Sequence, residues 1–144
     1  MSDIVHATLV AHWIQDRWRG ALIRGASGAG KSTLALRCLK AGFRLVADDR
    51  VIVFGSAAQL FGKPPKVLAG LMEVRGFGVI AAPQTLALCR IDLVVDLVSD
   101  VERVPAPAEV RLEQACLPRL ALAFTDEDLP LRLAAALAAL QRGL

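Results

Sequence analysis

The residues best suited to chemistry form a glycine-rich run in the first quarter of the chain. Gly25, Gly28 and Gly30 lead into Lys31 and Ser32 with the spacing G-x-x-x-x-G-K-S, which is the pattern of a phosphate-binding P-loop. Glycine lets the backbone take positive φ and approach a ligand closely, so that successive N–H groups turn toward one anion. Lys31 adds a point charge for the β- and γ-phosphates, and Ser32 offers a hydroxyl to Mg²⁺. The expected nucleotide contacts are Gly25, Ala26, Ser27, Gly28, Ala29, Gly30, Lys31, Ser32 and Thr33.

The segments on both sides of this run have the patterns that a P-loop needs. Residues 18–24 are partly apolar, as in a buried strand, and residues 32–41 have apolar side chains at helical spacing. Gly42 follows where a helix often ends. A glycine-rich turn that binds nothing is the alternative, but the order strand, loop, helix favours a working P-loop.

Carboxylates that follow apolar segments are candidates for metal binding and proton transfer. Asp48 and Asp49 come after residues 43–47, and Asp96 ends the branched run of residues 91–95. Two adjacent carboxylates can divide the roles, because like charges raise one pKa and suit that group to accept and return a proton. A solvated turn at Asp48 and Asp49, and a loop-capping role for Asp96, are the alternatives. The residues alone do not rank Asp48 against Asp49.

Three further residue types are plausible at such a site. Glu73 could supply a second metal ligand, since Mg²⁺ prefers carboxylate oxygen, and Arg75 could contact phosphate through its planar guanidinium. A surface ion pair explains the pair Glu73 and Arg75 equally well. His6 and His12 lie in an apolar stretch, where a packed, hydrogen-bonded histidine is the commoner outcome.

The rest of the sequence predicts a single α/β domain over residues 1–144. We expect strands at residues 4–13, 18–24, 43–47, 51–54 and 91–98, and a short edge strand at 59–62. Residues 67–74 fit a helix or a strand, and residues 125–130 carry the features of a helix start before a helix at 131–140. The segments 4–13 and 18–24 are expected to form a hairpin.

Composition limits the class of protein. The 144 residues are 55% hydrophobic, yet no apolar run reaches the roughly 18 residues of a membrane span. A mean hydropathy of +0.49 therefore predicts buried sheet, with apolar surface left for a homo-oligomeric interface. The net charge of +3 comes from scattered basic residues, which argues against nucleic-acid binding. Three widely spaced cysteines and the absence of a leader pattern predict a cytoplasmic protein.

Three segments together resemble one family. Residues 25–32, residues 45–51 (LVADDRV) and residues 71–80 (LMEVRGFGVI) are similar, in order and in spacing, to the catalytic domain of HPr kinase/phosphorylase. Residues 6–10 resemble that family's histidine-containing strand ahead of the loop. The chain looks like the short form that lacks the family's N-terminal domain. The similarity extends from about residue 6 to residue 80.

The resemblance implies a P-loop fold with a mixed central sheet, similar to that of phosphoenolpyruvate carboxykinase. It implies ATP- and Mg²⁺-dependent phosphorylation of a serine on an HPr-type phosphocarrier of the phosphotransferase system, with the reverse phosphorylase reaction. By the same resemblance Lys31 binds the phosphates, Ser32 and Glu73 hold the metal, and Asp49 accepts the seryl proton. The other residues that it assigns to catalysis are Asp48, His6 and Arg75. The family's long-chain members imply a hexamer.

Two other functions stay open on sequence grounds. A small-molecule P-loop kinase shares the loop but usually adds an arginine-bearing lid, and no arginine-rich insertion interrupts this chain. A nucleotide-binding regulator without transfer activity is the other alternative. It agrees with the lack of a match to the family's late Pro-x-x-x-Gly-Arg-Asn loop, which is tied to dephosphorylation.

Overall fold

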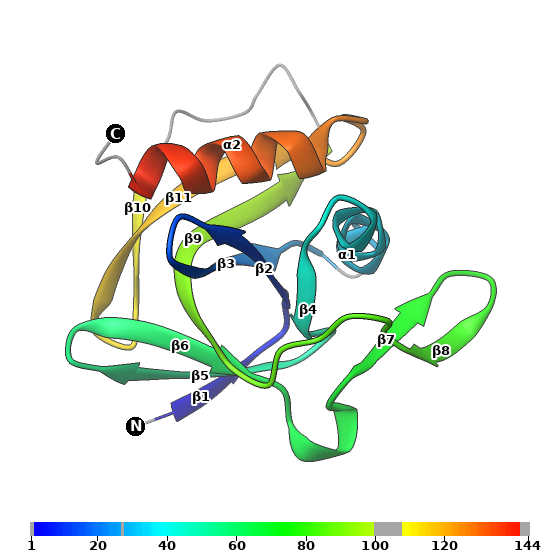
Figure 1. The fold of residues 1–144 in the computed structure, drawn as a ribbon, viewed down its shortest axis with the longest axis horizontal. Coiled ribbons are helices and arrows are strands. Elements are labelled where there is room, and N and C mark those ends of the chain that lie inside the picture. The colour runs from blue at the N-terminus through cyan, green and yellow to red at the C-terminus, as the bar shows by residue number, and fades with distance from the viewer. Residues whose placement is uncertain (1, 27, 100–107, 142–144) are drawn as a thin grey trace.

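The computed structural model describes residues 2–26, 28–99 and 108–141, which form a nine-stranded sheet, a separate hairpin and two α-helices (Figure 1). The elements are β1 (Ser2–Val5), β2 (Thr8–Ile14), β3 (Arg17–Arg24), α1 (Lys31–Lys40), β4 (Arg44–Ala47), β5 (Val51–Ser56), β6 (Gln59–Lys63), the 3-10 turn η1 (Lys66–Leu68), β7 (Leu71–Val74), β8 (Gly78–Ala81), β9 (Cys89–Val98), β10 (Ala108–Leu112), β11 (Ala115–Ala123) and α2 (Leu129–Gln141). The expected α/β architecture with a mixed sheet is confirmed.

The order of strands explains where functional residues can meet. The main path of the sheet is β1-β5-β6-β9-β3-β2-β4, and β11 pairs with β9 while β10 pairs with β11. Strand β3 runs parallel to β9, but β2 is antiparallel to both β3 and β4. Strands β3 and β4 therefore run in the same direction and end at the edge where β2 begins. This edge carries Gly25 after β3, Asp48 after β4 and Thr8 at the start of β2.

Two hydrophobic cores stabilise the sheet from opposite faces. The first lies under the helices, where Ile23 of β3 packs with Leu34 of α1 and Leu133 of α2. The second is enclosed by the curl of the sheet and contains Leu22 and Leu60. The high content of apolar residues thus fills two cores, one on each face of the sheet. None of the helices in the described ranges has the length and apolar character needed to span a membrane.

The N-terminal segment differs from the single strand expected at residues 4–13. The chain bends at His6 and Ala7, because β1 pairs with β5 whereas β2 pairs with β3 and β4. The expected hairpin between residues 4–13 and 18–24 is confirmed for β2 and β3, with Gln15 and Asp16 in its turn. The bend places His6 at the sheet edge described above.

One expectation for a strand needed correction. The strand at residues 59–62 is an interior strand and not an edge strand, since β6 pairs with both β5 and β9. Its glycine allows close packing there, because a Cβ on Gly62 would approach Leu9 Cδ2 to 2.6 Å. The helix expected at residues 131–140, with its start in residues 125–130, is confirmed: α2 begins at Leu129, after a turn in which Asp126 accepts a hydrogen bond from the Asp128 N–H at 2.8 Å.

Residues 67–74, which fitted a helix or a strand, contain part of η1 and all of β7. Strands β7 and β8 form a two-stranded sheet outside the main one, and the hairpin projects from the body in Figure 1. Buried Met72 anchors its base in the first core. The hairpin is therefore a fixed arm beside the sheet edge that carries the P-loop.

Candidate functional site

The glycine-rich run forms a loop between β3 and α1, with the conformation that its sequence predicts. Gly28 and Gly30 have φ of 83° and 100°, a region that residues with a Cβ rarely adopt. A Cβ on either residue would meet no atom within 4 Å, so glycine is required by the backbone and the space beside the loop is open. Gly30 is the N-cap of α1 and has no side-chain cap, which leaves the helix N-terminus free for an anion. Ser27 lies outside the described residues.

Lys31 is buried, and within the described ranges no opposite charge lies beside it. Its residue is 7% exposed, and Nζ donates to the carbonyl oxygens of Gly25 at 2.9 Å and Ala26 at 3.1 Å. Among the described residues, no carboxylate lies within ion-pair distance of this ammonium group. A buried charge is costly unless it is paired, so the side chain is suited to meet an anion in the loop.

Asp48 is the complementary case of a buried anion. It is 4% exposed, and its Oδ1 accepts hydrogen bonds from Thr8 Oγ1 at 2.9 Å and Ser32 Oγ at 2.8 Å. Oδ2 accepts from the Glu73 backbone N–H at 2.9 Å. All of these donors are neutral. In the described part of the chain Asp48 has no cationic partner, and its carboxylate lies directly behind the Ser32 hydroxyl.

Asp49, the next residue, is placed differently. The Arg50 N–H bonds to the Asp48 carbonyl at 2.8 Å, and Asp49 is the central residue of this turn with φ of 70°. A three-residue turn with positive φ at its central residue is rare and strained. Backbone strain of this kind is typical of functional positions. The Asp49 side chain is 58% exposed, and its Oδ1 lies 2.7 Å from His6 Nε2. The pairing follows from register, because Val5 of β1 lies opposite Val51 of β5.

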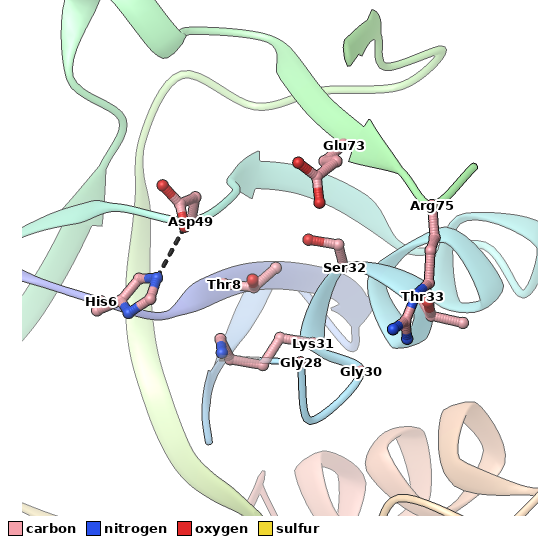
Figure 2. A pocket seen from close by; sticks show the side chains of 10 residues that line it. All are labelled: His6, Thr8, Gly28, Gly30, Lys31, Ser32, Thr33, Asp49, Glu73 and Arg75. Carbon is pink, nitrogen blue, oxygen red and sulfur yellow. Dashed lines mark hydrogen bonds and ion pairs between the residues drawn. The ribbon is translucent and has the colours of Figure 1, made fainter. Parts of the chain in front are cut away.

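The hairpin of β7 and β8 supplies two more side chains. Glu73 lies on β7 and Arg75 in the turn that follows, where the Phe77 N–H bonds to the Val74 carbonyl at 2.9 Å. Figure 2 shows the Glu73 carboxylate and the Ser32 hydroxyl turned toward a common space, with Asp49 paired to His6 beside it and Arg75 reaching toward Thr33. The hydrogen bond from the Glu73 N–H to Asp48 holds the hairpin beside the end of β4.

The side chains predicted from sequence do come together. One cavity of about 260 Å³ is lined by His6, Thr8, Gly28, Gly30, Lys31, Ser32, Thr33, Asp49, Glu73 and Arg75 (Figure 2). Gly25 and Ala26 contribute carbonyl oxygens to Lys31, and Asp48 lies behind the wall. Thr8 was missed by the sequence analysis. Its signal was weak, a hydroxyl at the start of an apolar strand two residues after His6.

Two candidates from the sequence lie elsewhere. Asp96 accepts hydrogen bonds from Arg24 Nε at 2.8 Å and from Arg119 Nε, so its charge is already compensated. His12 stacks on Phe43 with a centroid distance of 4.6 Å, as expected for a packed histidine. The carboxylates that can serve the loop are therefore Asp48, Asp49 and Glu73.

The arrangement fits a phosphate chain with a divalent cation. An anion in the loop would meet Lys31, the N-terminus of α1 and the loop N–H groups. For a cation beside Ser32, the nearby carboxylates of Asp48 and Glu73 are the candidate ligands. Within the described ranges no three His, Cys, Asp or Glu side chains form a complete metal site. Mg²⁺ is commonly held by one or two carboxylates together with substrate phosphates.

The curated relatives that the chain matches carry the name HPr kinase/phosphorylase. The protein from Clostridium beijerinckii is 51% identical over 61 residues, which are 42% of this chain and 20% of the relative. The protein from Lactobacillus acidophilus is 40% identical over 102 residues, which are 66% of this chain and 30% of the relative. The matched regions thus span less than a third of these relatives.

A solved structure and a family complete the comparison. The structure of the HPr(Ser) kinase/phosphatase from Coxiella burnetii matches with a TM-score of 0.81 and 25% identity, covering 97% of this chain and 96% of that one. Residues 2–116 match the family described as HPr Serine kinase C-terminal domain. With the P-loop, the Asp48–Asp49 turn and the β7–β8 hairpin in one site, the chain belongs to the HPr Serine kinase C-terminal domain family.

Proposed function

We propose that the protein transfers the γ-phosphoryl group of ATP, with Mg²⁺, to a serine hydroxyl of an HPr-type phosphocarrier. One observation carries the proposal: buried Asp48 is hydrogen-bonded to Ser32, the residue that follows buried Lys31, and each of the two buried charges has neutral partners in the described structure. Opposite charges kept apart in this way suit an anionic phosphate chain at Lys31 and a cation at Asp48. The names of the relatives supply the nature of the acceptor.

The charged residues at the cavity have distinct roles in this reaction. Lys31 and the N-terminus of α1 hold the β- and γ-phosphates, and Arg75 approaches the same phosphates from the hairpin. Ser32 and Glu73 would hold Mg²⁺, with Asp48 orienting the Ser32 hydroxyl. When bound, the ion neutralises charge on the phosphate oxygens.

Asp49 is the base in this proposal. Its carboxylate takes the proton of the seryl hydroxyl as the seryl oxygen bonds to the γ-phosphorus, and the bond from that phosphorus to the β–γ bridging oxygen breaks to release ADP. His6 bonds to Asp49 Oδ1, and Arg50 Nε lies 3.7 Å from the other carboxylate oxygen, Oδ2. The exposed side chain of Asp49 is accessible to a protein acceptor, whereas the side chain of Asp48 is buried.

The remaining proposals concern the protein as a whole. We propose that residues 1–144 act as one catalytic domain, located in the cytoplasm and without a role in nucleic-acid binding. The reverse phosphorylase reaction would use Asp49 as proton donor. A homo-oligomer, with a hexamer as the family's form, remains a prediction from resemblance.

The decisive experiment follows labelled γ-phosphate from ATP and Mg²⁺ to purified HPr-type carriers of the source organism. Wild type is compared with Asp49→Asn, since asparagine tolerates the positive φ of this turn and removes the charge. Asp16→Asn is the matched control, because Asp16 is 88% exposed and lies in the β2–β3 turn outside the cavity. We expect serine labelling by wild type and control, and a rate about 10²- to 10⁴-fold lower in Asp49→Asn with ATP affinity retained.

The other outcomes separate the alternatives. Transfer by Asp49→Asn at the wild-type rate would exclude Asp49 as the base. ATP binding by wild type without transfer to any carrier would favour a nucleotide-binding regulator. Labelling of a metabolite and not of a carrier would instead identify a small-molecule P-loop kinase.

A further inference from the structure

A second cavity adjoins the first on the far side of the P-loop. It has a volume of about 190 Å³ and shares Gly28, Gly30, Thr33 and Arg75 with the cavity that faces Asp49. The two cavities therefore adjoin at the loop and the first turn of α1. None of the roles proposed above uses the second cavity.

The lining of this second cavity is mainly apolar. Its floor is formed by Leu97 of β9 and Leu129 of α2, which are 6% and 1% exposed. Phe124, which follows β11, is 42% exposed although it is a large apolar side chain. An aromatic ring at the rim of an apolar cavity is well placed to stack on a flat ligand.

The segment that carries Phe124 is held in place on both sides. The Phe124 N–H donates to the Val98 carbonyl at 3.0 Å, which fixes it to the end of β9. Arg37 of α1 donates to the carbonyl oxygens of Asp126, at 3.4 Å, and of Glu127. The segment that carries Phe124 is thus bonded to α1, the helix that follows the P-loop. A segment already held in place loses little conformational freedom when a ligand binds, which lowers the entropic cost of binding.

The P-loop residues in the lining of the second cavity indicate what occupies it. With Asp49 as the base, a phosphate chain in the loop would have its γ end toward Asp49, which leaves its ester-linked end for the side of Thr33, a residue that lines both cavities. Figure 2 shows Thr33 and Arg75 side by side at this junction. We propose that the second cavity binds the base and ribose of the nucleotide, with the base against Phe124. This inference rests on the proposed use of ATP.

The chemistry of the lining also sets the expected selectivity. The described side chains with polar atoms are Thr33, Arg37 and Arg75, and among the described residues no carboxylate or amide side chain lines the cavity. Stacking depends on the flat face of a base and is tolerant of its identity, whereas base reading needs matched donors and acceptors at its edge. The cavity should therefore accept adenine and guanine with similar affinity.

Calorimetric titration with Mg-ATP and with Mg-tripolyphosphate tests the assignment, because tripolyphosphate has the phosphates and lacks the nucleoside. We expect wild type to bind ATP about tenfold or more tightly than tripolyphosphate. Phe124→Ala should weaken ATP binding about tenfold and leave tripolyphosphate binding unchanged. Phe54→Ala is the matched control, since Phe54 stacks on Phe61 in the β5–β6 hairpin and should change neither affinity.

Each contrary result has a distinct meaning. Equal wild-type affinity for the two ligands would overturn the nucleoside site and leave the proposed function intact, and this comparison needs no variant. Equal weakening of both ligands by Phe124→Ala would also overturn it, by showing that the substitution disturbs the loop. A wild type that binds neither ligand would overturn the proposed function and the nucleoside site together. Strong preference for ATP over GTP would contradict recognition by stacking.

Discussion

Asp48 and Asp96 are two partly or fully buried carboxylates near the P-loop strand, and they meet opposite kinds of partner. Asp96 on β9 is paired with Arg24 on β3 and Arg119 on β11, so its charge is neutralised within the sheet. Asp48, at the end of β4, accepts hydrogen bonds from two hydroxyls and one backbone N–H. Both carboxylates are well hydrogen-bonded, but in the described structure Asp96 has cationic partners and Asp48 has none.

The difference separates a structural ion pair from a ligand site. Arginines that neutralise Asp96 join three strands and leave nothing for a ligand to add. Neutral donors hold Asp48 in position without compensating its charge, which the proposed function assigns to a cation. Lys31 shows the same property with the opposite sign, since carbonyl oxygens hold its ammonium group. Buried charges with neutral partners therefore mark the site, and buried charges with opposite partners mark the scaffold.

The largest effect is expected for Lys31→Met, which keeps much of the side-chain stem and removes the charge. We expect phosphoryl transfer to fall about 10³-fold, because a preorganised positive charge on the phosphates is lost. Nucleotide should no longer raise Tm, since stabilisation by a ligand follows its affinity. Without nucleotide, Tm should stay the same or rise, because an unneutralised buried charge has been removed. Transfer assays and thermal unfolding check both parts.

Lys40→Met is the matched control for Lys31→Met, because Lys40 is an exposed lysine at the other end of α1. It should retain transfer and the nucleotide-dependent rise in Tm. A large loss of Tm in ligand-free Lys31→Met would contradict the comparison, since it would make Lys31 part of the scaffold.

A smaller effect is expected for Asp48→Asn, which removes the charge behind Ser32. Transfer should fall about 10- to 100-fold, as for other residues that orient a metal ligand. Part of the loss should be recovered at high Mg²⁺, because the variant binds the cation more weakly. The measurement is the transfer rate as a function of Mg²⁺ concentration in wild type and variant. An unchanged dependence on Mg²⁺ would show that Asp48 does not serve the cation.

The local parts of the site were predictable from sequence, because the loop depends on residues within one short segment. Glycine at positions 28 and 30 is required by positive φ, and Lys31 and Ser32 follow at fixed spacing. The strand before the loop and the helix after it were recognisable for the same reason. The family's other segments predicted which carboxylates would join them.

The ranking of those carboxylates depends on contacts that the sequence does not display. Asp48 is bonded to Thr8, which is 40 residues earlier, and to Glu73, which is 25 residues later. In the sequence, Asp96 follows an apolar segment as clearly as Asp48 does. Its arginine partners come into reach through the pairing of β9 with β3 and β11. Charge compensation is thus a property of sheet register, which the pattern of residues does not specify.

The third prediction tests the scaffold side of the comparison with Asp96→Asn. Removing the shared anion leaves Arg24 and Arg119 close together and partly buried, with side-chain exposures of 32% and 24%. We expect the free energy of unfolding to fall by about 2 kcal/mol, measured by urea denaturation at pH 7. Transfer at a temperature where the variant is folded should match wild type. A loss of transfer without a loss of stability would place Asp96 in the site.

The smallest effect concerns pH, and it uses the same variant. Burial alone would raise the pKa of Asp96, but hydrogen bonds and charges from Arg24 and Arg119 outweigh it and hold this pKa below its ordinary value. A carboxyl group with a lowered folded-state pKa contributes stability above its unfolded pKa, near 3.9, and loses it as pH falls through the folded-state pKa. The difference in unfolding free energy between wild type and Asp96→Asn should therefore be constant from pH 7 to pH 5 and shrink below about pH 4. Urea titrations at these pH values measure it. A difference that persists unchanged at the lowest pH would mean that packing, and not the charge of Asp96, joins the three strands.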